Sequence, residues 1–119
     1  MVALGFCLAW PTATAAEAAA SPLAKRAMHL LRDHCVSCHN PDKTKGDLDL
    51  TKRQTTLAGG SEGPAFVEGN PGGSRLIQFL KPDSDPHMPP KKQLSDDHIA
   101  TLSQWISAGA VWLPEELAV

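Results

Sequence analysis

The chain of 119 residues contains no tyrosine, and aromatic residues make up only 5% of it. Few large side chains are therefore available for a hydrophobic core, which is marginal for a single domain of about a hundred residues. The charges nearly balance, with 11 Lys and Arg against 13 Asp and Glu. No basic stripe argues for nucleic acid as a partner. No apolar run approaches the roughly 20 residues that span a bilayer as a helix, so we expect no transmembrane segment.

The N-terminal segment, residues 1–16, is typical of a secretory signal peptide. A short apolar core, Val2 to Trp10, precedes the small residues Ala13 to Ala15, although no Lys or Arg comes before the core. Cys7 lies in this segment, and the bulky Phe6 before it does not suit a lipid-modified cysteine. We therefore predict a periplasmic or otherwise exported protein that loses Cys7 with its signal peptide.

The run Cys35-Val36-Ser37-Cys38-His39 is the most informative pattern in the chain. A Cys-x-x-Cys-His run attaches a c-type haem, because two thiols three positions apart can each add to one vinyl group of the same porphyrin. His39 would then lie beneath the iron as an axial ligand. We predict one covalent haem c, held by thioethers from Cys35 and Cys38. A buried porphyrin would also supply the apolar surface that the side chains lack.

Three other interpretations of Cys35 and Cys38 remain open. A structural zinc site needs four ligands, usually including a second close Cys/His pair, and no such pair is present. His29 and His34 precede the motif on one predicted helix. A thioredoxin-like dithiol favours a βαβ context, which the sequence does not show. A disulfide between the two cysteines is compatible with an oxidising compartment.

The apolar spacing predicts three helices separated by long loops. The first runs from Leu23 to the motif and carries apolar residues at i, i+3 and i+4 spacing, with Pro22 in its first turn. The second is Arg75–Leu80, capped by Ser74, and the third begins at Ser95 and ends at Gly109. We predict an all-α fold with three main helices and long loops around one haem. Residues 17–22 form a leader, 23–113 the haem domain and 114–119 a C-terminal tail.

A low-spin electron carrier needs a sixth iron ligand opposite His39, and Met88 is the favoured candidate. It lies in the run Met88-Pro89-Pro90, whose prolines stiffen the backbone around the sulfur. A methionine ligand raises the reduction potential relative to two imidazoles. The neighbouring His87 is the rival ligand, whereas Met28 fits a helix core.

Further residues are expected around the haem. We predict that Leu31, Phe79, Pro89 and Trp105 pack against the porphyrin, with Trp105 also joining the last helix to the first. Arg75, Lys91 and Lys92 are expected to be solvated rather than paired with propionates. His29, His34 and His98 are expected to be exposed. Lys81, Lys91 and Lys92 form a weak basic patch for an acidic partner, offset by Asp83 and Asp85.

Taken together, these motifs resemble the planctomycete-type cytochrome c domain, within the small class I cytochrome c fold. The matching segments cover nearly all of residues 31–110 and are Cys35–His39, Lys45–Leu50, Leu57–Pro64, Gly69–Leu76, His87–Pro90 and Leu94–Ala110. The resemblance implies a mostly helical haem pocket, with Cys35 and Cys38 as thioether cysteines and His39 and Met88 as axial ligands. In that family the domain often heads larger exported multidomain proteins, so the chain is expected to be a stand-alone domain or a fragment.

The leading functional hypothesis is an exported monohaem electron carrier that exchanges single electrons with a redox protein and is not an enzyme. Two alternatives remain. An open or labile sixth iron site would suit a haem peroxidase or a gas or redox sensor, for which His87 is the nearby acid/base candidate. The other alternative is a haem-bearing interaction module that serves a larger, separately encoded protein.

Overall fold

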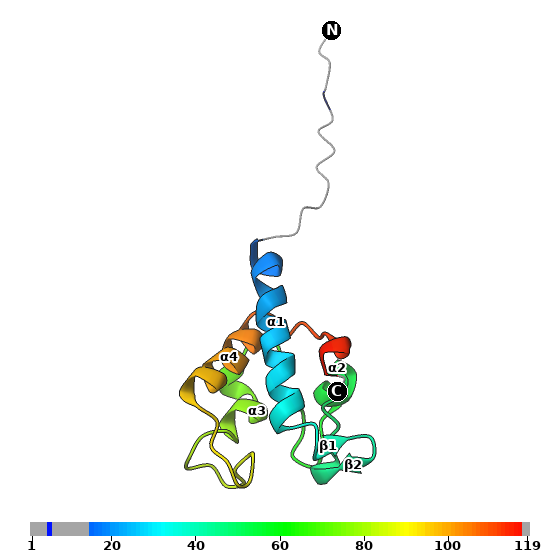
Figure 1. Ribbon diagram of the computed structural model, residues 1–119, viewed down its shortest axis with the longest axis vertical. Helices are drawn as coiled ribbons and strands as arrows, with labels where there is room; N and C mark the ends of the chain where they lie inside the picture. The colour runs from blue at the N-terminus through cyan, green and yellow to red at the C-terminus, as the bar shows by residue number, and fades with distance from the viewer. Residues whose placement is uncertain (1–4, 6–14, 118–119) are drawn as a thin grey trace.

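The computed structural model describes Gly5 and residues 15–117. Within this part of the chain the main elements follow in the order α1 (Ala15–His34), β1 (His39–Asn40), β2 (Lys43–Thr44), α2 (Arg53–Ala58), α3 (Arg75–Gln78) and α4 (Asp96–Ser107) (Figure 1). Short 3-10 turns lie at 45–47, 71–73 and 114–116. None of the helices described in residues 15–117 combines the length and apolar character that crossing a membrane requires.

The first helix is longer than the sequence predicted. It begins at Ala15, so Pro22 lies in its interior rather than in its first turn. Residues 15–20 are mostly alanine, which has the highest helix propensity and favours this early start. The predicted leader, 17–22, is therefore helical. The predicted signal peptide, 1–16, lies outside the described residues except for Gly5 and the first two residues of α1.

The fold is mostly helical, but it differs from the predicted all-α arrangement of three helices. The described residues form four α-helices and one two-stranded antiparallel sheet, in which His39 pairs with Thr44 and Asn40 with Lys43. The hairpin arises locally, because Asn40 Oδ1 accepts hydrogen bonds from the backbone N–H of Asp42 at 3.0 Å and of Lys43 at 2.8 Å. This side-chain turn directs the chain back on itself.

The helix α2 is the element that the sequence did not predict. Thr56 is fully buried within it, and the Thr56 hydroxyl donates to the Lys52 carbonyl at 2.7 Å. The Thr55 hydroxyl donates to the Asp49 carbonyl at 2.8 Å. Threonine has only moderate helix propensity, so α2 depends on these side-chain bonds and on burial rather than on its sequence pattern.

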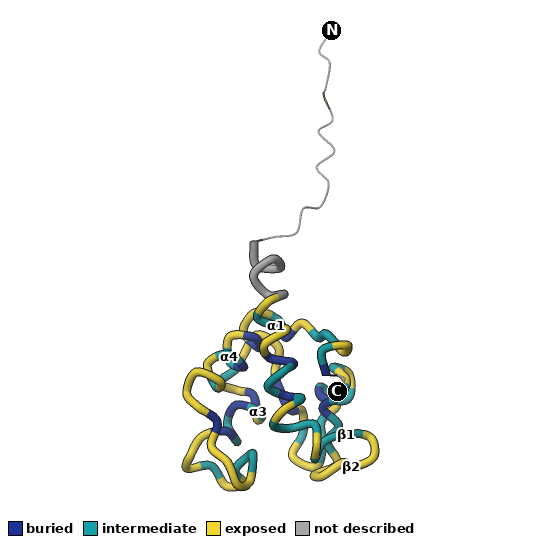
Figure 2. The backbone as a smooth tube through the Cα atoms, in the orientation of Figure 1, coloured by how far each residue is buried: buried dark blue, intermediate teal, exposed yellow. Residues whose placement is uncertain are grey.

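The hydrophobic core lies where α1 packs against α4, and the buried residues of the tube gather there (Figure 2). Ala27, Met28 and Leu31 from α1 and Trp105 and Ile106 from α4 are almost completely buried. The side-chain hydroxyl of Ser95 caps α4 by accepting from His98 N, as predicted. Ser74 precedes α3, but its hydroxyl does not cap that helix.

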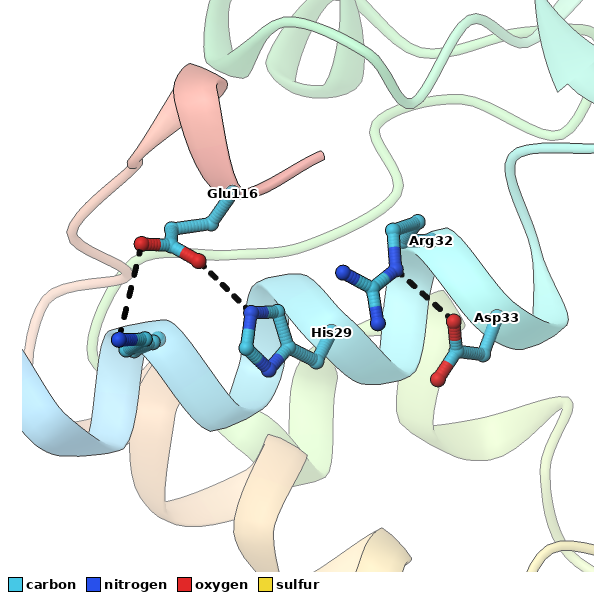
Figure 3. A network of polar contacts seen from close by, with 5 residues as sticks. His29, Arg32, Asp33 and Glu116 are labelled. Carbon is cyan, nitrogen blue, oxygen red and sulfur yellow. Dashed lines mark hydrogen bonds and ion pairs between the residues drawn. The ribbon is translucent and has the colours of Figure 1, made fainter. Parts of the chain in front are cut away.

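The segment predicted as a C-terminal tail packs against α1. Glu116 Oε2 lies 2.7 Å from His29 Nε2, and Glu116 Oε1 lies 3.9 Å from Lys25 Nζ (Figure 3). Leu117 is only 6% exposed. Residues 114–117 are thus part of the folded unit, and His29 is a half-buried hydrogen-bonding residue rather than an exposed one.

Candidate cofactor site

A cavity of about 570 Å³ lies between the motif turn, the segments around 45–50 and 60–65, the helix α3 and the loop 86–92. Its size is in the range of pockets that bury small organic ligands and cofactors, roughly 300–1,000 Å³. Much of its lining is apolar and comes from Leu48, Leu50, Ala65, Leu76, Phe79 and Leu80. Such a lining suits a flat, mainly apolar group.

The motif turn brings its three chemical groups to this cavity. The backbone continues from α1 through hydrogen bonds from Cys35 N to Leu31 O at 2.9 Å and from His39 N to Cys35 O at 3.2 Å. The tight turn places Cys35, Cys38 and His39 in the lining of one cavity, and both thiols are free. The short spacing of Cys35, Cys38 and His39 along the chain therefore brings all three side chains to the same cavity.

The site residue His39 has unused hydrogen-bonding capacity. Its Nδ1 atom is buried and has no hydrogen-bond partner among the described residues. A buried polar atom left unpaired costs about 1–3 kcal/mol. The imidazole also lines the cavity, and because Nδ1 is buried, Nε2 is the ring nitrogen left for a metal-bearing group there. The donor set of two thiols and one imidazole on an apolar pocket fits a haem.

The wall next to His39 is tied to the motif through the backbone. Leu50 N donates to His39 O at 2.9 Å, and Lys45 N donates to Cys38 O at 3.1 Å. Ser61 N in turn donates to Gly46 O at 2.8 Å. These bonds join the 45–50 and 60–65 segments, which the sequence left as loop, into one wall of the cavity.

The electrostatics of the motif weigh against the other interpretations of the cysteines. Burial raises the pKa of the Cys35 thiol to about 12, and the nearby Cys38 adds to the effect. A redox dithiol instead uses a thiolate of lowered pKa. In residues 15–117 no three His, Cys, Asp or Glu side chains lie close enough together to hold a metal ion, so a zinc site finds no further ligands there.

The structure separates the two candidates for the sixth ligand. Met88, Pro89 and Pro90 line the cavity, and Met88 N donates to Phe79 O at 2.8 Å. His87 is not among the lining residues. Its Nδ1 lies 3.0 Å from Pro89 O, and its Nε2 lies 2.7 Å from Gln93 Oε1. Met88 is thus available at the cavity, whereas the ring nitrogens of His87 are engaged outside it.

Of the residues predicted to pack on the porphyrin, Phe79 and Pro89 line the cavity, but Leu31 and Trp105 do not. Leu31 is buried in the helical core. The Trp105 indole N–H donates to Val111 O at 2.8 Å, and its ring packs on Trp112, with 5.3 Å between ring centroids. The same apolar face of α4 therefore serves helix packing rather than the cofactor site.

Several polar residues line the cavity that the sequence did not place there. His34, expected to be exposed, is half-buried in the cavity lining and lies beside the exposed His98, with 6.1 Å between ring centroids. Lys45 and Glu62 also line it and are exposed, together with the Arg75, Lys91 and Lys92 expected to be solvated. No periodicity marks the polar members of this set. Lys45, Glu62 and Arg75 lie in segments that carry the family resemblance, whereas His34, Lys91 and Lys92 lie just outside them.

These features define a small, mostly helical domain in which the Cys35–His39 motif lines an apolar cavity. The family model described as Planctomycete cytochrome C matches residues 35–92, which include the Cys35–His39 motif and Met88. The resemblance drawn from the sequence is thereby confirmed over this segment. A cytochrome c family implies a covalently bound haem c and haem-based redox chemistry. The comparisons with curated proteins and with solved structures found no match.

Proposed function

We propose that this chain is an exported monohaem c-type cytochrome that carries single electrons. Cys35 and Cys38 would hold the porphyrin through two thioethers, and His39 and Met88 would bind the iron from opposite sides. One observation carries the proposal: Met88, far along the chain from the Cys35–His39 motif, lines the same cavity as the two thiols and the imidazole.

When bound, haem supplies an iron that gains and loses one electron without breaking a substrate bond. The side chains around the haem would set how readily the iron gains or loses the electron. The Met88 thioether favours the reduced state relative to a second imidazole, and the apolar side chains of Leu48, Leu76 and Phe79 limit access of water. His39 and Met88 would both hold the group throughout the exchange.

The exchange partner is proposed to be another exported redox protein. Exposed cations line the cavity, namely Lys45, Arg75, Lys91 and Lys92, against one exposed acid, Glu62. This excess of positive charge would neutralise carboxylates of the bound haem and favour an acidic surface on the partner. Export follows from the chemistry of haem attachment, which cytochromes c complete outside the cytoplasm.

The test is an optical spectrum of the protein coexpressed with a cytochrome c maturation system, recorded oxidised and reduced. Haem that survives acid-acetone extraction, with a near-red sulfur-to-iron band lost in Met88→Ala, is the expected result. Met28→Leu is the matched control, because Met28 is fully buried in the core and its replacement should keep the band.

Two outcomes contradict the proposal. Covalent haem without the near-red band in the wild type would leave the sixth site to His87, water or an external ligand, and would favour a sensor or peroxidase. Absence of covalent haem, under conditions that mature a control cytochrome, would remove the cofactor altogether.

A further inference from the structure

The loop that carries Met88 is closed at its base by Gln93. The Gln93 side-chain amide donates from Nε2 to the Leu80 carbonyl at 2.7 Å and to the Leu94 carbonyl at 3.1 Å. Leu80 lies two residues after the short helix α3, and Leu94 lies two residues before α4. One side chain thus joins the two points where the Met88 loop leaves and re-enters the helical body.

The same contacts fix which way the amide faces. Because both neighbours of Nε2 are carbonyl oxygens, which only accept, the NH2 group must lie on that side. Gln93 Oε1 is therefore directed to His87, whose Nε2 lies 2.7 Å away and donates to it. His87 precedes Met88, so the Gln93 amide connects the helical body to the residue next to the sulfur ligand.

The rest of the loop offers little else to hold it. Most residues from Lys81 to Lys92 are exposed or half-buried, and none of them is fully buried. Apart from Met88 N to Phe79 O at 2.8 Å and Lys81 N to Gln78 O at 3.3 Å, the hydrogen bonds made by these residues stay within the loop or go to Gln93. A loop with so little apolar burial relies on its polar contacts for a single geometry.

We infer that Gln93 is a positioning residue that acts through His87 to keep the Met88 sulfur at the iron. The inference rests on the proposed function. A neutral thioether holds the iron against competing ligands only if its supporting side chains keep it in place. Loss of the Gln93 contacts should therefore make Met88 easy to displace while leaving haem attachment through Cys35 and Cys38 intact.

The experiment titrates the oxidised holoprotein with imidazole and follows loss of the near-red band. In Gln93→Leu the imidazole concentration at half-loss should fall at least about tenfold, as expected when one to two hydrogen bonds are lost. Gln78→Leu is the matched control, because Gln78 Nε2 also donates to a backbone carbonyl, Gly72 O at 3.1 Å, but away from the Met88 loop. Its midpoint should equal that of the wild type.

Two further variants make the test specific. Gln93→Glu keeps an oxygen for His87 but loses both donors, so its midpoint should lie between those of the wild type and Gln93→Leu. His87→Ala should weaken Met88 as well, and combining it with Gln93→Leu should add little, since the two residues form one path. Should Gln93→Leu not fold, Gln93→Glu and His87→Ala decide the matter.

The outcomes separate this inference from the function on which it rests. A wild type without the near-red band overturns the His39/Met88 carrier and this role of Gln93 together. A wild type with the band, and Gln93 variants with unchanged midpoints, overturns the role of Gln93 alone. An equal fall of the imidazole midpoint in Gln78→Leu would also overturn the role of Gln93, because the effect would then reflect general destabilisation of the protein.

Discussion

Replacing Gly60 by alanine should disrupt the wall of the candidate haem cavity. A Cβ atom at this position would overlap the Gly46 carbonyl oxygen and lie 3.1 Å from Asp47 C and from Leu48 N. All three are backbone atoms, so no side chain can rotate out of the way. The two segments must move apart, and the bond from Ser61 N to Gly46 O at 2.8 Å lies at the point of separation.

The size of the effect follows from two contributions. Forcing an extra methyl group into a packed site costs about 1–3 kcal/mol. Loss of one backbone hydrogen bond adds about 1 kcal/mol. The free energy of unfolding should therefore fall by about 2–4 kcal/mol in Gly60→Ala, which lowers the Tm of a domain of this size by roughly 10–30 °C.

Thermal unfolding followed by circular dichroism measures this change, with Gly72→Ala as the control. Neither glycine has a positive φ, so neither substitution strains the backbone by itself. A Cβ on Gly72 would make only an ordinary contact, 3.8 Å from Asn70 Oδ1, and should be tolerated. If Gly60→Ala unfolds at the same temperature as Gly72→Ala, the close approach of the two cavity segments does not exist.

Three further predictions test the polar contacts. Ser74 is fully buried and hydrogen-bonded to two backbone groups, so Ser74→Ala should lower the free energy of unfolding by about 1–3 kcal/mol in a denaturant titration. A negligible change would contradict this. The hydrogen bond from His29 holds the pKa of the Glu116 carboxyl below its ordinary 4.5. Glu116→Gln should therefore be less stable than the wild type at neutral pH, and the difference should vanish as acid protonates Glu116 in the folded state. In haem-free Cys38→Ala, the remaining thiol Cys35 should react slowly with iodoacetamide until denaturant is added, since burial raises its pKa to about 12. A rate independent of denaturant would refute that expectation.

Features encoded within a few residues could be predicted from the sequence. The Cys35–His39 motif depends only on the spacing of two thiols and one imidazole along a turn. The start of α4 was predictable for the same reason, because the Ser95 hydroxyl and the acidic side chains of Asp96 and Asp97 act on the first turn that they adjoin. The family resemblance added the expectation of a mostly helical haem pocket with His39 and Met88 as axial ligands.

Features set by contacts between distant segments could not be predicted in this way. The sequence favours Met88 over His87 through the run Met88-Pro89-Pro90, but the position of each side chain relative to the cavity is an example of what it could not show. Their difference arises because Gln93 and Pro89 engage the His87 ring, leaving Met88 in the cavity lining. Similarly, Trp105 carries an apolar face that suits either a porphyrin or a helix, and only its contacts with Val111 and Trp112 assign it to the core.

The sequence by itself therefore determined the Cys35–His39 motif and the local helix signals, because motif spacing and capping act over a few residues. The tertiary structure alone decided the helix α2, the docking of Glu116 on His29 and the joined segments that wall the cavity. The physical reason is that burial and long-range hydrogen bonds depend on which surfaces meet, and no local pattern records that meeting.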